Sequence, residues 1–374
     1  MSELNADGYK NLKNISMKLS PDMNIFCGEN AQGKTNLIEA IWLCSGCKSF
    51  RGTRDKDYIG FGTDKAEIQL SFTDNQRKQA IDFFVLKENP KEKRITLNGV
   101  KLGGMTELFG KFKCVIFTPE DLELIKGPPE KRRLFLDMGT SQIKNNYVSA
   151  MNKYESVLSQ RNALLKDIYL GRVSNSLLEI WDEQLAQTGS YISVLRQAYT
   201  QKLNAAASRL YYNLSKSKEE LSITYNSTVF KNLAGRMDYK GDMKDEYIKK
   251  LHDNEKTDIR LGFTTIGTHR DEVVSKINGL NVRDFGSQGQ QRSVALLFKL
   301  AQAEILRQET GEMPVVLLDD VLSELDLLRQ DFVINEIQGM QVFVTCCDPT
   351  AVLRYKMGNI YFMRDGEIYN TIYK

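Results

Sequence analysis

Cysteine is scarce in this sequence, and long apolar runs are missing from it. Six cysteines in 374 residues are too few for a disulfide scaffold. No apolar run reaches the roughly 20 residues that a membrane-spanning helix needs. The first residues also lack the pattern of a secretory signal. We therefore expect a protein of the reducing cytoplasm, with about two domains for a chain of this length.

Charge of one sign is also scarce. The formal net charge is only +3, although 26% of the residues are charged. Because positive and negative residues nearly balance, the protein has no global positive field of the kind that attracts nucleic acid. Any surface that binds nucleic acid must therefore be a local patch of basic residues.

Cys44 and Cys47 form a C-x-x-C pair, which raises the question of redox or metal chemistry. A zinc site would need a second pair with similar spacing, and Cys346 and Cys347 are adjacent. The alternative is that both are small apolar residues on the helix that follows the stretch described next. We favour this alternative, because isolated C-x-x-C matches are common.

The stretch GENAQGKT, residues 28–35, matches the phosphate-loop pattern G-x-x-x-x-G-K-[ST] in full. An apolar run, MNIFC, precedes it, and the segment after it has helical spacing, so the motif stands between a strand and a helix. Backbone N–H groups of such a loop surround phosphate oxygens at the positive end of the helix. We expect a nucleotide to be bound by Gly28, Glu29, Asn30, Ala31, Gln32, Gly33, Lys34 and Thr35. Lys34 should reach the β- and γ-phosphates, and the Thr35 hydroxyl should bind Mg²⁺.

A second motif, PVVLLDD at residues 314–320, supplies the carboxylates that a phosphate loop requires. Its apolar run predicts a strand buried on both faces. Asp319 is then the candidate Mg²⁺ ligand, directly or through water. Asp320 is the candidate catalytic residue that orients or deprotonates the attacking water. Helix capping or simple solvation is the alternative for these two acids.

The order of the predicted elements indicates an α/β fold in which the two ends of the chain fold together. Alternating patterns at 65–102, with Asn98-Gly99 as a hairpin turn, predict antiparallel strands. Residues 113–122 predict a core strand ended by a proline, and long helical patterns follow from about residue 129. Later segments predict strands at 261–267, 273–279 and 341–347, a buried helix at 293–306 and a closing hairpin at 360–369. We predict a discontinuous first domain, residues 1–128 and 257–374, with residues 129–256 as an inserted helical arm.

The stretch SQGQQRS, residues 287–293, opens the buried helix. Ser287 or its neighbours could cap that helix, which is the simple explanation. Alternatively, Ser287, Gln288, Gly289 and Gln290 form a second anion-binding helix N-terminus, directed at a γ-phosphate.

Together, the phosphate loop, this stretch and the acidic motif resemble the ATP-binding-cassette (ABC) ATPases. More specifically, the chain resembles the RecF family, whose members are relatives of the SMC proteins. The resemblance is carried by GENAQGKTNLIEAIW, KSFRG, FTPEDLELIKGPPEKRRLFLD, THRDE, FGSQGQQRSVALLFKLAQAE and LLDDVLSELD, in this order along nearly the whole chain. The segment between Thr35 and Ser287 is too short for the long coiled coil of SMC proteins and suits the short arm of RecF.

The resemblance implies an ABC-type ATPase head with a helical arm, in a crescent-shaped molecule. It implies ATP and Mg²⁺ as ligands and an ATP-dependent homodimer, in which residues 287–290 dock in trans on the nucleotide of the partner. It also implies binding to double-stranded and gapped DNA, and association with the nucleoid. RecR and RecO are the implied partners, in loading the RecA recombinase, with links to replication and the SOS response.

Three departures from the ABC pattern predict slow hydrolysis, and therefore a switch more than a motor. Residues 118–121 stand where a glutamine loop is expected but contain no glutamine. Asp320 stands where most ABC ATPases have glutamate, and a shorter carboxylate reaches water less well. The only histidines, His252 and His269, precede Ser287, so neither can be the switch histidine that follows the acidic motif. His269, beside Arg270 and Asp271, is either structural or part of an interface.

Two groups of basic residues are candidates for DNA binding. The first comprises Lys48, Arg51 and Arg54, and the second comprises Lys131, Arg132 and Arg133 with nearby Lys126. Phosphate contacts need cations but no fixed spacing. A solvated face or intramolecular ion pairs explain any one of these residues equally well. With no base-reading motif, we expect DNA binding to be independent of sequence.

Two rival classes remain open from the sequence. A P-loop phosphotransferase would pass the γ-phosphate to a small acceptor, but it needs no helix that docks in trans. The other class is another SMC-like protein or a transporter ATPase, each with a different partner. The short arm disfavours the SMC-like protein. Co-purification with membranes would indicate the transporter ATPase.

Overall fold

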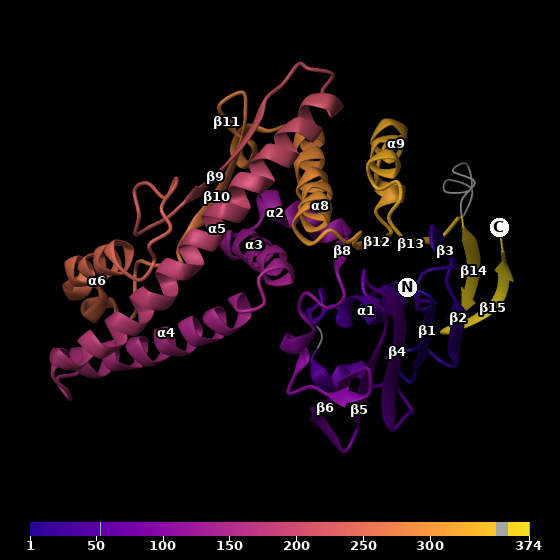
Figure 1. Ribbon diagram of the computed structural model, residues 1–374, viewed down its shortest axis with the longest axis horizontal. Coiled ribbons are helices and arrows are strands. Elements are labelled where there is room, and N and C mark those ends of the chain that lie inside the picture. The colour runs from indigo at the N-terminus through magenta and orange to yellow at the C-terminus, as the bar shows by residue number, and fades with distance from the viewer. Residues whose placement is uncertain (53, 349–357, 374) are drawn as a thin grey trace. The chain divides into compact units, whose positions relative to one another are not determined.

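The two ends of the chain meet in one six-stranded sheet of the computed structural model, which describes residues 1–52, 54–348 and 358–373 (Figure 1). The strand order is β15-β14-β3-β13-β12-β8. The strands are β3 (Met23–Cys27), β8 (Cys114–Phe117), β12 (Val315–Asp319), β13 (Val342–Cys346), β14 (Asn359–Arg364) and β15 (Glu367–Ile372). β3, β12 and β13 are parallel neighbours and are buried at every position, which explains their continuous apolar runs.

A second sheet in the same part of the chain is antiparallel, with the order β2-β1-β4-β5-β6-β7. Its strands are β1 (Glu3–Asp7), β2 (Ile15–Lys18), β4 (Lys65–Thr73), β5 (Lys78–Leu86), β6 (Asn89–Leu97) and β7 (Val100–Lys101). The predicted turn at Asn98-Gly99 is confirmed, because both residues have positive φ, 53° and 78°, and join β6 to β7. Alternating burial along β4 shows one face in the core.

Three helices follow or contain the predicted motifs. They are α1 (Lys34–Leu43), α8 (Gln288–Thr310) and α9 (Leu327–Glu336). Eight of the ten residues of α1 are buried, and the helix packs on β12 and β13. The phosphate loop is therefore anchored by a buried strand on one side and a buried helix on the other.

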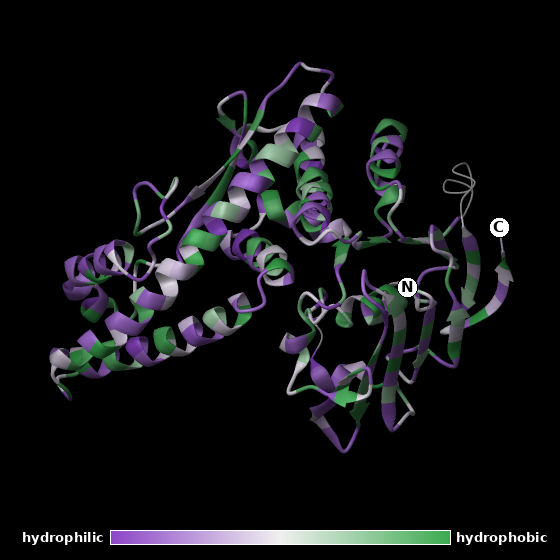
Figure 2. Cartoon of the chain, viewed as in Figure 1, coloured by the Kyte–Doolittle hydropathy of each residue, from purple (hydrophilic) through white to green (hydrophobic). Residues whose placement is uncertain are grey.

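The middle of the chain is mainly helical, as the sequence predicts. It contains α2 (Glu123–Lys126), α3 (Pro129–Ile143), α4 (Tyr147–Tyr169), α5 (Leu178–Leu214), α6 (Asp242–Leu261) and α7 (Val282–Phe285). A small sheet, β11-β10-β9, lies among them, formed by β9 (Leu221–Asn226), β10 (Glu272–Ile277) and β11 (Leu280–Asn281). Figure 2 shows hydrophobic and hydrophilic residues alternating along α4 and α5, as expected of helices with one apolar face.

The strand predicted at 261–267 is wrong. Leu261 ends α6, and the residues after it form a loop. Side chains of the helical region satisfy the backbone there: Asn162 accepts from the Thr264 N–H at 2.8 Å, and Asp258 accepts from the Thr265 N–H at 3.0 Å. These bonds replace the ladder that a strand would need.

The structure divides into two compact units, Met1–Asp121 with Phe298–Lys374, and Leu122–Leu297. The second unit is longer than the predicted arm of residues 129–256. The reason is the pairing of β10 with β9, which joins residues after 257 to the helical region. Among the residues that the structure describes, no helix has the length and apolar character needed to cross a membrane.

Candidate nucleotide-binding site

Glycines give the phosphate loop its tight course between β3 and α1. Gly33 has a φ of 101°, which favours glycine, and a Cβ there would lie 2.9 Å from Asn11 Oδ1. A Cβ on Gly28 would lie 2.5 Å from the Met363 carbonyl oxygen. Side chains are thus excluded from both ends of the loop, which leaves its backbone free to approach a ligand.

Lys34 points into this loop. Its Nζ donates to the carbonyl oxygens of Gly28 and Glu29 at 2.6 and 2.7 Å, and the residue is only 8% exposed. A buried ammonium with no carboxylate among these contacts is a ready partner for an anion. This geometry fits phosphate binding by the residues predicted for it.

The predicted magnesium pair lies together at the carboxyl end of the sheet. Thr35 Oγ1 donates to Asp319 Oδ1 at 3.0 Å, and Thr345 Oγ1 donates to the same oxygen at 2.8 Å. Burial raises the pKa of Asp319, and the hydrogen bonds from Thr345 and Thr35 oppose that rise. A hydroxyl and a carboxylate are the hard oxygen donors that suit Mg²⁺.

No cluster of three metal-binding side chains occurs in the described part of the chain. Thr35 and Asp319 would therefore need non-protein oxygens to complete a coordination shell. Phosphate oxygens and water supply them in phosphate-loop proteins. The donor set fits a metal that binds together with a nucleotide.

Asp320 follows Asp319 with a positive φ of 53°, a conformation that aspartate tolerates better than most residues. Its N–H donates to Thr345 Oγ1 at 2.9 Å. The Ser323 hydroxyl donates to the Asp320 carboxylate at 3.0 Å. The two acids are thus fixed in different settings, Asp319 buried in the site and Asp320 held by the turn after β12.

A chain of amide groups extends the site beyond the residues predicted from the sequence. Asn11 donates to the carbonyl of Ala31 at 3.1 Å and accepts from Asn36 at 2.7 Å. Arg51 Nη1 donates to Asn36 Oδ1 at 3.1 Å. The exposed Arg51 therefore lies at the first turn of α1, beside the phosphate loop.

The segment that carries Arg51 is held by Glu39, a fully buried carboxylate on α1. Glu39 accepts hydrogen bonds from Lys10 and from the Ser49 hydroxyl. Sequence reasoning did not find Glu39, Asn11, Asn36 or Thr345. Asn36 and Glu39 stand in the block GENAQGKTNLIEAIW, but the pattern of that block gives them no role. No motif marks Asn11 or Thr345, and only the fold brings them to the site.

The C-x-x-C pair is buried, as the simpler interpretation proposes, but it follows α1 and is not on that helix, which ends at Leu43. Cys44 and Cys47 are each 1% exposed, and burial raises the pKa of both thiols to about 12. Such thiols stay protonated and unreactive at neutral pH.

The capping explanation for Ser287 is confirmed. Ser287 Oγ accepts from the Gln290 N–H at 3.2 Å, and Gln290 Oε1 accepts from the Ser287 N–H at 2.8 Å. This reciprocal pair is a capping box at the start of α8. The Gln290 amide also donates to Glu219 at 2.8 Å. Docking of residues 287–290 on a nucleotide in trans stays a prediction.

The basic candidates differ in their surroundings. Lys48, Arg51, Arg54 and Lys131 are exposed. Arg132 is 5% exposed and forms a two-pronged ion pair with Glu272, at 2.7 Å for both bonds, while Arg133 donates to the carbonyl of Asp271 at 2.8 Å. The geometry favours a structural role for Arg132 over contact with DNA.

His269 lies in a polar network of the second unit. Its Nδ1 is 2.8 Å from the Tyr154 hydroxyl, and its Nε2 is 3.1 Å from the Thr264 carbonyl oxygen. Burial lowers its pKa to about 4. A neutral imidazole with both nitrogens in hydrogen bonds favours the structural interpretation of His269.

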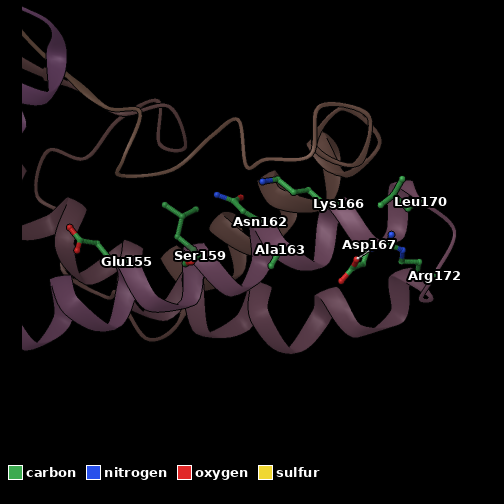
Figure 3. A pocket seen from close by; sticks show the side chains of 9 residues that line it. Glu155, Ser159, Asn162, Ala163, Lys166, Asp167, Leu170 and Arg172 are labelled. Atoms are coloured by element: carbon green, nitrogen blue, oxygen red, sulfur yellow. Dashed lines mark hydrogen bonds and ion pairs between the residues drawn. The ribbon is translucent and has the colours of Figure 1, made fainter.

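A cavity of about 790 Å³ lies along α4 (Figure 3). Glu155, Lys166, Asp167 and Arg172 line it with charges of both signs. None of the residues predicted for nucleotide binding lies there, so its size does not make it the candidate site.

Comparison with known proteins agrees with this geometry. Residues 1–368 match the model of the RecF/RecN/SMC N-terminal domain. The chain is 39% identical over 373 residues to the DNA replication and repair protein RecF of Clostridium beijerinckii, covering 99% of this chain and 98% of that protein. It is 40% identical over 346 residues to RecF of Clostridium perfringens, covering 92% of each.

Solved structures give the same result. The structure of the recombination mediator protein RecF with ATP, in the RecFOR pathway, matches with a TM-score of 0.89 at 35% identity, over 99% of this chain and 97% of that one. An SMC head bound to a winged-helix domain of ScpA matches with a TM-score of 0.56 at 15% identity, covering 100% of this chain and 97% of that one, which shows the shared ABC-type ATPase head fold alone. The chain belongs to the RecF family.

Proposed function

We propose that this protein is an ATP-dependent DNA-binding recombination mediator of DNA repair and replication. The contact between Thr35 and Asp319 carries the proposal, because it joins the phosphate loop to the acidic strand in the arrangement that ATP with Mg²⁺ requires. The relatives named RecF, one of them solved with ATP, support the choice of nucleotide and pathway.

The residues of the site have distinct roles in this proposal. Backbone N–H groups of residues 28–33 and the Lys34 ammonium bind the phosphates. Thr35 and Asp319 would hold Mg²⁺, which neutralises phosphate charge when it is bound. Asp320 orients the attacking water. Arg51 and Asn36, at the first turn of α1, provide further polar contacts to the nucleotide.

ATP acts as a switch in this proposal. The N-terminus of α8, with Ser287 as its cap, docks in trans on the γ-phosphate of a second copy, and hydrolysis removes that attraction. Two features support slow hydrolysis. Asp320 is short and bonded to Ser323. Residues 118–121 contain no glutamine, and Asp121 among them pairs with Lys299 at 3.0 Å.

The closed homodimer binds double-stranded and gapped DNA through exposed basic residues, for which Lys48, Arg51, Arg54 and Lys131 are the candidates. Arg132 and Arg133 are less favoured, because they bond to Glu272 and Asp271. RecR and RecO act with it to promote loading of RecA. Binding should not depend on base sequence, so a footprint confined to one sequence would contradict the proposal.

The test is the molecular mass in solution without nucleotide, with ADP, and with ATP and Mg²⁺, each with and without gapped DNA. We expect the mass of a monomer without nucleotide or with ADP. Only with ATP should the mass double, and the dimer should then retain DNA. A mass indifferent to ATP would remove the trans role of residues 287–290. ATP consumption that requires a small acceptor would instead favour a phosphotransferase.

A further inference from the structure

Two free thiols meet directly beneath the phosphate loop. Cys27 is the last residue of β3 and Cys346 the last residue of β13, and they are partners in the parallel register of these strands. Their sulfur atoms are 3.2 Å apart. Parallel strands lie about 4.8 Å apart, which is within the Cα separation that a disulfide spans.

Cys27 borders an open cavity, although the residue is only 1% exposed. It lines a cavity of about 490 Å³, together with Cys347, Gln32, Arg364 and Tyr369. Cys347 itself is exposed. A small polar oxidant that enters this cavity therefore comes next to Cys27.

The chemistry of Cys27 favours attack by its sulfur. The hydrogen bond between the Cys27 and Cys346 thiols lowers the pKa of Cys27, and the Lys34 ammonium adds to that effect, while burial opposes it. The three thiols of Cys44, Cys47 and Cys114 have the opposite character, since burial raises the pKa of each. The contact with Cys27 raises the pKa of Cys346 in turn, so Cys27 is the thiol of this pair that attacks first.

We propose that Cys27 and Cys346 are a site of reversible oxidation, at which hydrogen peroxide converts the two thiols to a disulfide. Cys27 Sγ attacks one peroxide oxygen, the O–O bond breaks, and water leaves as a sulfenic acid forms. Cys346 Sγ then attacks this sulfur, the S–O bond breaks, and a second water leaves. Two thiols and one peroxide thus become one disulfide and two waters, and a dithiol reductant reverses the change.

The disulfide should change the phosphate loop because Cys27 directly precedes the loop and the residue after Cys346 contacts it. Gly28 follows Cys27, and its carbonyl accepts from Lys34. Cys347 follows Cys346, and its thiol donates to Asn30 Oδ1 at 3.3 Å. The sulfurs must close from 3.2 Å to about 2.05 Å. We expect this movement to weaken ATP binding about tenfold, since displacements near 1 Å are costly in a site of this kind.

The test begins with the bond itself, without nucleotide. The full chain is treated with hydrogen peroxide, free thiols are alkylated after denaturation, and peptides are analysed by mass spectrometry. We expect one linked pair, Cys27 with Cys346, and alkylated Cys44, Cys47 and Cys114. Alkylated Cys27 and Cys346 after treatment, or a product at Cys347 alone, would overturn the proposal.

The effect on ATP binding rests on the proposed function and is measured separately, by calorimetry on reduced and oxidised protein. Cys346→Ala should bind ATP as the reduced chain does and lose the sensitivity to peroxide, whereas the matched control Cys47→Ala should keep it. A linked pair with unchanged ATP affinity would refute the effect on binding. Failure of the reduced chain to bind ATP would refute the proposed function, while the peptide analysis still decides the site.

Discussion

The Thr35 hydroxyl lies 3.0 Å from the Asp319 carboxylate, although 284 positions separate the two residues in the chain. The contact exists because β3 and β12 both flank β13 in one parallel sheet, so the carboxyl ends of the strands meet at the same edge. Thr345, on the strand between them, bonds the same carboxylate and orients it.

Replacement of Lys34 by alanine should weaken ATP binding by about 10- to 100-fold, as expected for loss of a charge-assisted contact. Lys34→Arg should also weaken it, since a planar guanidinium does not fit where the compact ammonium bonds two carbonyls. Calorimetric titration with ATP and Mg²⁺ measures both variants. An affinity equal to that of the unchanged chain would contradict the role of Lys34.

Asp320→Asn should keep ATP binding and lower the hydrolysis rate by about 100-fold or more, the usual contribution of a general base. The ATP-bound dimer should then persist. Single-turnover hydrolysis and molecular mass in solution measure the two effects. Glu324→Gln, an exposed acid four residues later, is the matched control and should change neither. A variant that stays monomeric with ATP would show that Asp320 has another role.

Ser287→Arg should block dimer closure and leave the ATP affinity of the monomer nearly unchanged. Arginine removes the capping bond with Gln290 and adds bulk at the N-terminus of α8. Ser287→Asn keeps a capping side chain and should dimerise, which separates capping from bulk. Loss of ATP binding in the monomer would show that Ser287 does not act in trans.

Arg51→Ala should reduce ATP affinity about tenfold. The Arg51 guanidinium donates a hydrogen bond to Asn36 in the first turn of α1, and this bond holds it beside the phosphate loop. Arg54→Ala removes an exposed cation three residues away and serves as the control. If Arg51 instead binds DNA, its replacement should lower DNA affinity and the salt dependence of binding while ATP affinity stays the same.

The stability of the second unit should fall between pH 7 and pH 4. The folded-state pKa of His269 is lowered from 6.5 to about 4, so the unfolded chain binds the extra proton first as pH falls. Stability from the neutral ring is therefore present above pH 6.5 and lost towards pH 4, by at most about 3 kcal/mol. Urea unfolding of His269→Gln should show a smaller pH dependence than the unchanged chain.

Several parts of the molecule followed from local sequence patterns. The phosphate loop, the buried strands 23–27 and 315–319, and the Asn98-Gly99 turn are each set by residues close together in the chain, whose spacing and backbone preferences are visible in the sequence. The strand expected at 261–267 was wrong because contacts with residues outside the segment, which its local pattern does not show, decide its conformation. Its apolar residues suggested a ladder, but Asn162 on α4 and Asp258 near the end of α6 bond the backbone instead.

The sequence by itself therefore determined where the phosphate-loop motif and the strand that carries the two acids lie, because those motifs are continuous. Only the tertiary structure decided which other residues contact these motifs. It put Thr345 on Asp319, Arg51 beside Asn36, Arg132 in an ion pair with Glu272, and the Cys27 thiol against that of Cys346. Each of these contacts depends on strand order and register or on helix packing, which are properties of the whole fold and leave no local pattern to read.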